Sequence, residues 1–181
     1  NTLLSHFDDA SSERGWMLRY NSSGTALLFR YTTDGSTEID LTSSALSLTV
    51  GQWYHIAVTR QSTNIRFYLD GVAKGSSGIS TNTIFNPSQT LLVGVYNTGT
   101  DTHFLTGDSD QIRISNTNRY PDGTTFTPST TPFTADANTK LLIQSDFSEG
   151  GLGADHSGNY NLFTATNLVA SDMMLDSPMN N

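Results

Sequence analysis

The clearest pattern of apolar and polar positions lies between residues 51 and 75, in the run GQWYHIAVTRQSTNIRFYLDGVAKG. Apolar side chains recur at every second position in 53–59 and again in 65–69, which is the period of a strand with one buried face. Asp70-Gly71 then tolerates positive φ, as a two-residue hairpin turn requires. The pattern predicts two antiparallel strands followed by a tight turn into a third strand at 72–74.

The rest of the chain favours the same class of structure. Hydrophobic residues make up 35% and charged residues 14% of the 181 positions, and Ser, Thr, Asn and Gly fill the difference. This balance suits short strands joined by many polar turns. The one helical candidate, 167–175, has too few apolar repeats to predict more than a short surface turn. We therefore expect an all-β chain whose length suits one sandwich domain.

The order of these segments resembles a known family. GQWYHIAVTR, a polar turn, IRFYLDG and a short apolar strand together resemble the laminin-G-like branch of the concanavalin A-like lectin/glucanase superfamily. The segments 91–96, 107–115 and the Pro-rich 126–143 follow in the order of the late strands and exit of such a domain. The resemblance implies a two-sheet antiparallel jelly-roll sandwich. It extends to modules that occur in tandem in the tail fibres or appendages of tailed phages.

The same resemblance implies a division of the chain that is offset from the usual module boundary. Residues 1–126 resemble a laminin-G-like sandwich that lacks its usual first strands, because NTLLSHFDD is similar to a mid-domain strand. Residues 127–139 are a Pro/Thr-rich linker, and 140–181 resemble the start of a next module. Either the chain is a piece of a longer polypeptide, or its last segment completes a sheet here or in a neighbouring subunit. An open sheet edge invites pairing with another chain, so we expect a homo-oligomer.

Charge and composition narrow the partners. A net charge of −8 and a pI near 4.6 disfavour binding to nucleic acid, which needs clustered Lys and Arg. No apolar run approaches the roughly 20 residues of a membrane helix, so we expect no membrane insertion. The sequence has no cysteine and hence no disulfides. This fits parts of a virion, assembled with other virion subunits in a reducing host cytoplasm and acting on the extracellular particle.

The enzymatic motifs are incomplete. Glu38-Ile39-Asp40 resembles the strand-borne carboxylates of jelly-roll glycoside hydrolases, which alternate on one face so that nucleophile and acid/base flank the glycosidic bond. The next alternate position is Thr42, so the second catalytic Glu is missing. We expect the two acids to point to solvent and the chain not to be an enzyme. The four histidines are not spaced as a metal pair, and His55 is expected to be packed or at a rim.

Oxygen ligands for a hard cation cluster at predicted loop ends. Asp8-Asp9 follow the LLSHF strand, and Asp108 and Asp110 come directly before the next apolar strand. Ca²⁺ prefers such oxygens, and domains that resemble this one often hold the ion at a sheet rim, so calcium at these four acids is one expectation. The alternative is that they are solvated turn residues. Asp155 in DHSGN predicts an Asx-type turn in the same way.

Sugar recognition needs an exposed aromatic face for stacking and amide or carboxylate partners for hydroxyls. These residue types occur together at 96–103, and Tyr120 follows a polar turn nearby in sequence. Rim loops of a rigid sandwich commonly carry function, although aromatic residues at strand ends also cap the core. Trp16 and Trp53 are expected in the core. The candidate carbohydrate-binding residues are Tyr96, Asn97, Asp101, His103 and Tyr120.

Three functions follow from these observations. The first is a non-catalytic binding or adhesion module of a phage virion protein that recognises host-surface glycans. The second is a purely structural virion decoration or assembly domain without a soluble ligand. The third, which the missing Glu disfavours, is a glycoside hydrolase or lyase. Fold alone does not decide among them, because related folds carry different activities.

Overall fold

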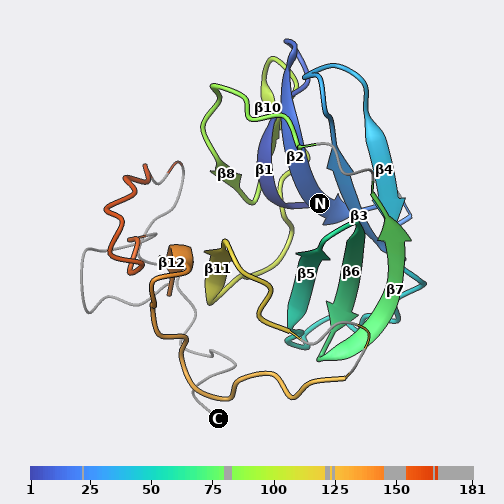
Figure 1. The fold of residues 1–181 in the computed structure, drawn as a ribbon, viewed down its shortest axis with the longest axis vertical. Coiled ribbons are helices and arrows are strands. Elements are labelled where there is room, and N and C mark those ends of the chain that lie inside the picture. The colour runs from blue at the N-terminus through green and yellow to red at the C-terminus, as the bar shows by residue number, and fades with distance from the viewer. Residues whose placement is uncertain are drawn as a thin grey trace. The chain divides into compact units, whose positions relative to one another are not determined.

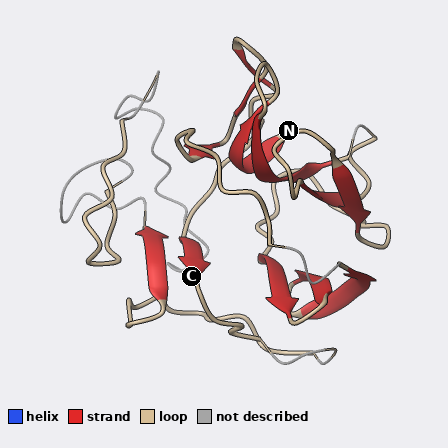
Figure 2. Cartoon of the chain, turned by 45° about the horizontal axis from the view of Figure 1, so that its top comes forward, coloured by secondary structure: helices blue, strands red, loops and turns tan. Residues whose placement is uncertain are grey.

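A computed structural model describes residues 1–21, 23–79, 83–120, 123, 125–144, 154–164 and 166. Every regular element in these ranges is a β-strand (Figure 2), so the described residues include no helix long and apolar enough to cross a membrane. The all-β prediction is confirmed. The chain forms two compact units: unit 1 is Asn1–Thr106 with Pro121–Phe126, and unit 2 is Gly107–Tyr120 with Thr127–Asn181.

The larger sheet of unit 1 has seven strands (Figure 1). They are β1 (Thr2–Asp8), β2 (Glu13–Tyr20), β3 (Leu27–Tyr31), β4 (Ile39–Thr42), β8 (Leu92–Val93), β9 (Tyr96–Asn97) and β10 (Asp101–Thr102). Their order is β10-β9-β1-β2-β3-β4, with β8 also paired to β1. All pairs are antiparallel except β1 with β9. β1 is therefore paired along both of its edges within the chain.

The smaller sheet of unit 1 is an antiparallel meander of β5 (Ile56–Gln61), β6 (Asn64–Leu69) and β7 (Val72–Gly78). It confirms the pattern predicted from 51–75, except that the first strand begins at Ile56 and not at Trp53. The turn between β6 and β7 is Asp70-Gly71, whose φ values of 50° and 75° are both positive, as in a type I′ turn. The Asp70 carboxylate also accepts a hydrogen bond from the backbone N–H of His55, at 2.8 Å.

One hydrophobic core lies between the two sheets of unit 1. Alternate residues of β6, namely Ile65, Phe67 and Leu69, are buried in a cluster with apolar residues of the larger sheet. Trp16 packs against this cluster as predicted, whereas Trp53 is half-buried and not part of it. Sheet packed on sheet in this way confirms the two-sheet antiparallel sandwich. The members from the larger sheet are Leu18, Leu27, Phe29, Tyr31 and Leu41.

The outer face of the smaller sheet is covered by a segment that is distant in sequence. Tyr68 points away from the core, yet it is 0% exposed. The ring of Phe126 covers it at a centroid distance of 5.2 Å and also contacts the ring of His55 at 5.6 Å. The backbone N–H of Phe126 donates to the carbonyl of Gly71, at 3.0 Å. His55 is thus a packed residue, as predicted.

Unit 2 is built on the antiparallel pair β11 (Ile112–Ser115) and β12 (Thr139–Ile143). The Pro/Thr-rich segment before β12 is fastened within this unit. The Arg119 guanidinium donates to both oxygens of Asp136, at 2.6 and 2.9 Å. β12 thus pairs with β11, a strand of its own chain. The module boundaries at 126 and 139 stay predictions.

A single carboxylate fastens the loop after β12 to that strand. Asp155 Oδ1 accepts from the backbone N–H groups of Leu142 and Ser157, at 3.0 and 2.9 Å. Its Oδ2 accepts from Ser157 Oγ and Asn161 Nδ2, both at 2.7 Å. Burial alone would raise the pKa of Asp155, but these hydrogen bonds outweigh burial and lower the pKa. The Asx-type turn predicted for DHSGN is confirmed.

Candidate functional site

The predicted sugar-binding loop is the short hairpin of β9 and β10. Asn97 Oδ1 accepts from the backbone N–H of Gly99, at 2.7 Å, and Gly99 has a φ of 96°. The Asn97 amide oxygen thus forms the tight turn at the tip of the hairpin. His103 follows β10 directly, is exposed and has a φ of 57°. The side chain of Asp101 lies outside the described residues.

Tyr96 does not offer the exposed aromatic face that was expected. It is only 6% exposed and forms a small second core with Phe7 and Met17. The Phe7 ring contacts Tyr96 edge-on at 6.3 Å, and the ring of His103 lies 4.9 Å from it on another side. Burial raises the pKa of the Tyr96 hydroxyl. Tyr96 therefore supports His103, and the exposed rings at this rim are those of His103 and Phe104.

A depression of about 480 Å³ lies beside His103. Its other walls come from the end of β2 and the turn into β3. That turn is ordered by Asn21, whose Oδ1 accepts from the backbone N–H groups of Thr25 and Ala26, at 2.9 and 3.2 Å. The volume is in the range of small-molecule sites, ~300–1,000 Å³. The lining residues are Asn1, Arg19, Tyr20, Asn21, Ser23, Gly24 and His103.

Arg19 is the least satisfied group in this depression. Its Nε is buried without a hydrogen-bond partner, and none of the ion pairs among the described residues includes it. Tyr20, next to it, is half-buried, and burial raises the pKa of its hydroxyl. A cation with unused donors, an aromatic ring and an amide thus converge on one hollow, which suits a hydroxyl-rich ligand.

Sequence reasoning found His103 but missed Arg19, Tyr20 and Asn21. A signal was present, because Tyr20-Asn21 precedes a polar turn with a glycine, as Tyr96-Asn97 does. Of the other predicted residues, Tyr120 belongs to unit 2, where its hydroxyl accepts from Arg113, at 3.4 Å. The structure does not bring Tyr96, Asn97 or Tyr120 into the lining of this depression. Their role in sugar binding stays a prediction.

The acids proposed for calcium are used in local contacts. Asp8 accepts from the backbone N–H of Ala10, at 2.9 Å, and Asp9 pairs with Arg14, at 3.0 Å. Asp110 accepts from the next backbone N–H, at 2.7 Å, and Asp108 is exposed. Among the described residues, no three His, Asp or Glu side chains are placed to share a metal ion. A calcium site at Asp8, Asp9, Asp108 and Asp110 stays a prediction.

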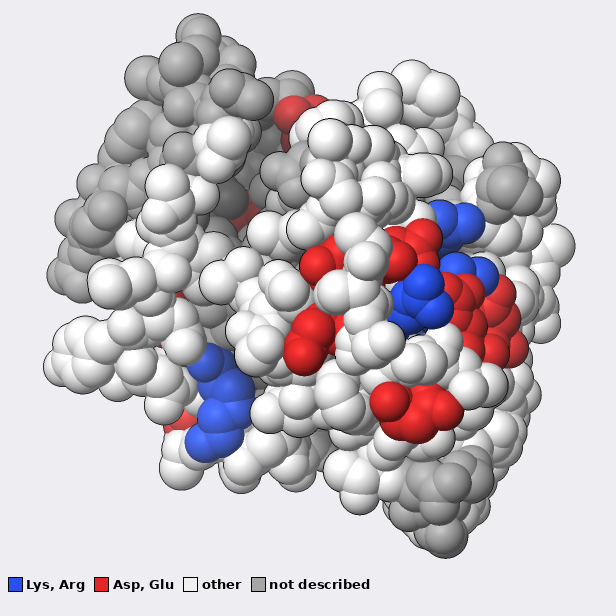
Figure 3. Space-filling model, turned by 90° about the horizontal axis from the view of Figure 1, so that it is seen from above, with Lys and Arg blue, Asp and Glu red and all other residues white. Residues whose placement is uncertain are grey.

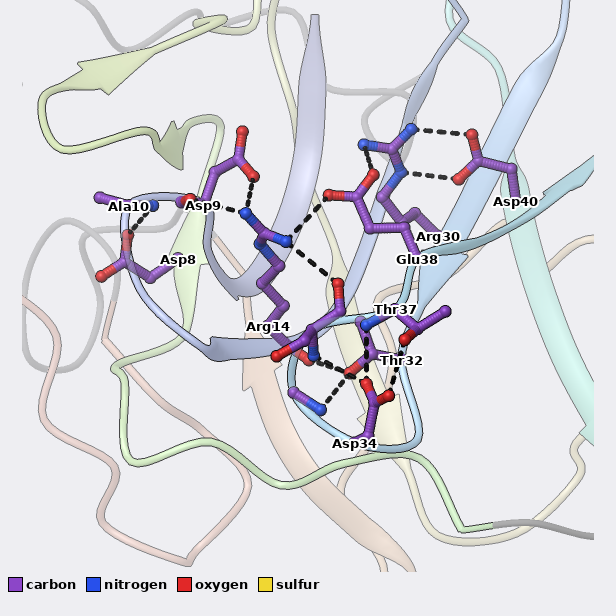
Figure 4. A network of polar contacts seen from close by, with 12 residues as sticks. Asp8, Asp9, Ala10, Arg14, Arg30, Thr32, Asp34, Thr37, Glu38 and Asp40 are labelled. Atoms are coloured by element: carbon purple, nitrogen blue, oxygen red, sulfur yellow. Dashed lines mark hydrogen bonds and ion pairs between the residues drawn. The ribbon is translucent and has the colours of Figure 1, made fainter.

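Asp40 is exposed and Glu38 is half-buried, and both carboxylates are also bound in ion pairs that the sequence did not predict. Arg30 lies opposite Asp40 on the neighbouring strand and donates to both of its oxygens, at 2.6 and 2.8 Å. Glu38 lies 2.5 Å from Arg30 and 3.8 Å from Arg14 (Figure 4). Figure 3 shows basic and acidic side chains side by side on the face that it presents. The acids are paired because cross-strand neighbours place two arginines among them.

Comparison with known proteins gives one match. A family model described as "Concanavalin A-like lectin/glucanases superfamily" matches residues 2–123. The match covers the whole described meander and the β9–β10 hairpin. No curated protein and no solved structure matches the chain.

Proposed function

Because the chain belongs to the concanavalin A-like lectin/glucanases superfamily, we propose that it is a non-catalytic module that binds carbohydrate. The site that we propose is the depression lined by Arg19, Tyr20, Asn21 and His103. The observation that carries the proposal is Arg19, which lines the hollow beside an aromatic ring and an amide and has no ion-pair partner among the described residues. The terminal N–H groups of its guanidinium can donate to sugar hydroxyls.

The pairing of Glu38 supports a binding role over hydrolysis. Glu38 forms ion pairs with two arginines, with Arg30 at 2.5 Å and with Arg14 at 3.8 Å, so its carboxylate is engaged by neighbouring side chains. Position 42 is Thr, so the strand also lacks the second catalytic carboxylate. If the chain were a glycosidase working through this motif, Glu38→Gln would abolish depolymerisation of polysaccharide.

The binding proposal is tested by a glycan array followed by calorimetry on the best hit. We expect Arg19→Gln and His103→Asn each to weaken binding about tenfold or more, because each removes a polar contact from the hollow. Asn is chosen at position 103 because it tolerates the φ of 57° found there. Arg60→Gln, which removes an exposed arginine of β5, is the matched control and should change nothing.

The outcomes separate the candidate functions. Binding that survives both Arg19→Gln and His103→Asn would place the site elsewhere, with the β9–β10 tip as the next candidate. An array without any hit, together with association that grows with concentration, would favour the structural role. Repeating the titration with chelator tests calcium, since a calcium-dependent lectin would lose its ligand.

The biological setting that we propose is a tail fibre, appendage or surface decoration of a phage virion. It is supported by the resemblance of the sequence to such modules and by the absence of cysteine. In that setting, the partners are host-surface glycans and other virion subunits, and the chain is a homo-oligomer. Light scattering coupled to size-exclusion chromatography tests the last point, and a monomer at every concentration would contradict it.

A further inference from the structure

Unit 2 contains a second hollow. Tyr120 is one of its lining residues, and the other described candidates for sugar binding are not among them. The hollow has a volume of about 360 Å³. Among the described residues of its lining, Arg113 of β11 is the only charged one, beside the rings of Tyr120 and Phe133. Hydroxyl side chains such as Ser129 and Thr131 form part of the remaining wall. All of these residues belong to the same compact unit.

Arg113 has no carboxylate partner in the part of the chain that the structure describes. Among the described residues it has two contacts: its Nη2 donates to the Tyr120 hydroxyl at 3.4 Å, which is long, and its guanidinium lies 4.0 Å from the centre of the Phe133 ring. Arg119, in the same unit, is instead clamped by both oxygens of Asp136. Since a guanidinium carries five N–H donors, most of those on Arg113 remain open to a ligand.

The stacking partner of Arg113 is held at both of its backbone groups. Gln111 Oε1 accepts from the N–H of Phe133, at 2.8 Å. Gln144 Nε2 donates to the carbonyl of Phe133, at 2.6 Å. Gln111 precedes β11 and Gln144 follows β12, so residues next to both strands of the pair hold the backbone of Phe133, whose ring lies against the guanidinium. An arginine positioned in this way loses little freedom when a ligand binds.

We propose that this hollow binds the carboxylate of an acidic sugar, a hexuronic acid. One planar guanidinium with a free edge matches a carboxylate through two parallel hydrogen bonds. The hydroxyl groups of the wall can pair with sugar hydroxyls, and the volume suits one monosaccharide. The chain carries a net charge of −8, so an anion is held here by contact with Arg113 and not by long-range attraction.

The test is an NMR titration of the full chain that observes the arginine Nε–H signals. Glucuronate, glucose and inorganic phosphate are added in turn. We expect glucuronate to shift the Arg113 signal in a saturable way and glucose to bind about tenfold more weakly or not at all, because it lacks the charge-assisted pair. Arg113→Gln should lose the glucuronate response, and Arg113→Lys should keep only part of it, since Lys lacks the fork. Lys140→Gln, which removes a cation of β12 outside the hollow, should leave the glucuronate response of the Arg113 signal unchanged.

Each other result overturns the proposal. A glucuronate response that is absent, or that is equal in the wild-type and Arg113→Gln proteins, excludes Arg113 as the receptor. A phosphate response as strong as that of glucuronate excludes the carboxylate class. If Arg113→Gln fails to fold, the wild-type Nε–H titration alone decides the matter. The proposal uses residues of unit 2 only, so it can fail while binding at Arg19 succeeds, and the reverse.

Discussion

At the scale of single residues, the carboxylates of Asp34, Asp70 and Asp155 each accept hydrogen bonds that hold a turn or loop. Asp34 accepts from the backbone N–H groups of Ser36 and Thr37, at 2.8 and 2.7 Å, in the connection between β3 and β4. Asp70 does the same for the meander and Asp155 for unit 2. For Asp34 and Asp155, the hydrogen bonds that the carboxylate accepts lower its pKa.

Asp34 should show this preference in its titration. Hydrogen bonds from the Thr37 backbone, the Thr37 hydroxyl and the Ser36 backbone lower the pKa of Asp34 from 3.8 to about 2. Its contribution to stability is therefore complete above pH 3.8 and is lost as the pH falls towards 2. Carbon-detected NMR of the carboxyl group should give a midpoint near 2, and Thr37→Ala should raise it. A midpoint at 3.8 in the wild-type protein would show that these bonds are not formed in solution.

Asp155 should be the more costly carboxylate to replace. Asp155→Asn swaps an acceptor oxygen for an NH₂ group that faces existing donors, so we expect a loss of about 2 kcal/mol in the free energy of unfolding of unit 2. Urea unfolding combined with hydrogen exchange of the β12 amides measures this loss. Asp108→Asn is the matched control, because Asp108 is exposed, and it should stay within about 0.5 kcal/mol. Equal effects of the two substitutions would rule out the described role of Asp155.

At the scale of elements, the meander of β5, β6 and β7 depends on one two-residue turn. Asp70 and Gly71 both have positive φ, which matches the twist of the flanking strands. The turn pairs Leu69 with Val72 and thereby sets which side chains of β6 face the core.

Gly71→Ala should destabilise unit 1 by about 1–2 kcal/mol, because an L side chain is strained at a φ of 75°. Gly78→Ala is the matched control. Gly78 is the last residue of β7, its φ is not in the left-handed region, and an added Cβ would meet only the Thr63 carbonyl, at 3.9 Å. Thermal unfolding of the two variants should separate them by several degrees. A Gly71→Ala protein as stable as Gly78→Ala would contradict the turn type.

At the scale of the whole molecule, pairing across long stretches of sequence joins segments that look separate along the chain. β12 pairs with β11, and Phe126 covers Tyr68 on the far side of a sheet that ends near residue 78. The ion pair between Arg119 and Asp136 links the residues after β11 to the Pro-rich segment before β12. The division of the chain that length and composition suggest therefore differs from the division that the contacts give.

A chain that ends at Asn138 should associate. Without β12, the apolar residues Ile112 and Ile114 of β11 lose their antiparallel partner, and the open edge can pair with another molecule. Light scattering coupled to size-exclusion chromatography should show a larger apparent mass for the shortened chain than for the full chain at equal concentration. If both give the same mass, β11 has found another partner, and pairing with β12 is not what keeps that edge closed.

The sequence predicts the features that depend on local residue patterns and on family resemblance. It does not predict contacts between segments that are distant along the chain. The period-two alternation and the Asp70-Gly71 pair specify the meander, because both act between neighbouring residues. The burial of Tyr96 by Phe7, the covering of Tyr68 by Phe126 and the hollow beside His103 depend on segments that meet only after folding. For this reason, the sequence did not single out Arg19 and Tyr20 of β2, which line the proposed site, although their residue types were visible. The two acids at 38 and 40 were found, but not the arginines that pair with them.

The division of the chain into interleaved units also bears on its inheritance. Unit 1 uses Pro121–Phe126, and unit 2 uses Gly107–Tyr120, so each unit contains a stretch that lies inside the span of the other. A recombination event within this region would carry β11 away from β12 or Phe126 away from Tyr68. Gene exchange that preserves folding must therefore keep residues 1 to 161 together, because Asp155 and Asn161 also bind β12 or each other, and we expect natural mosaic relatives to have their crossover points outside that block.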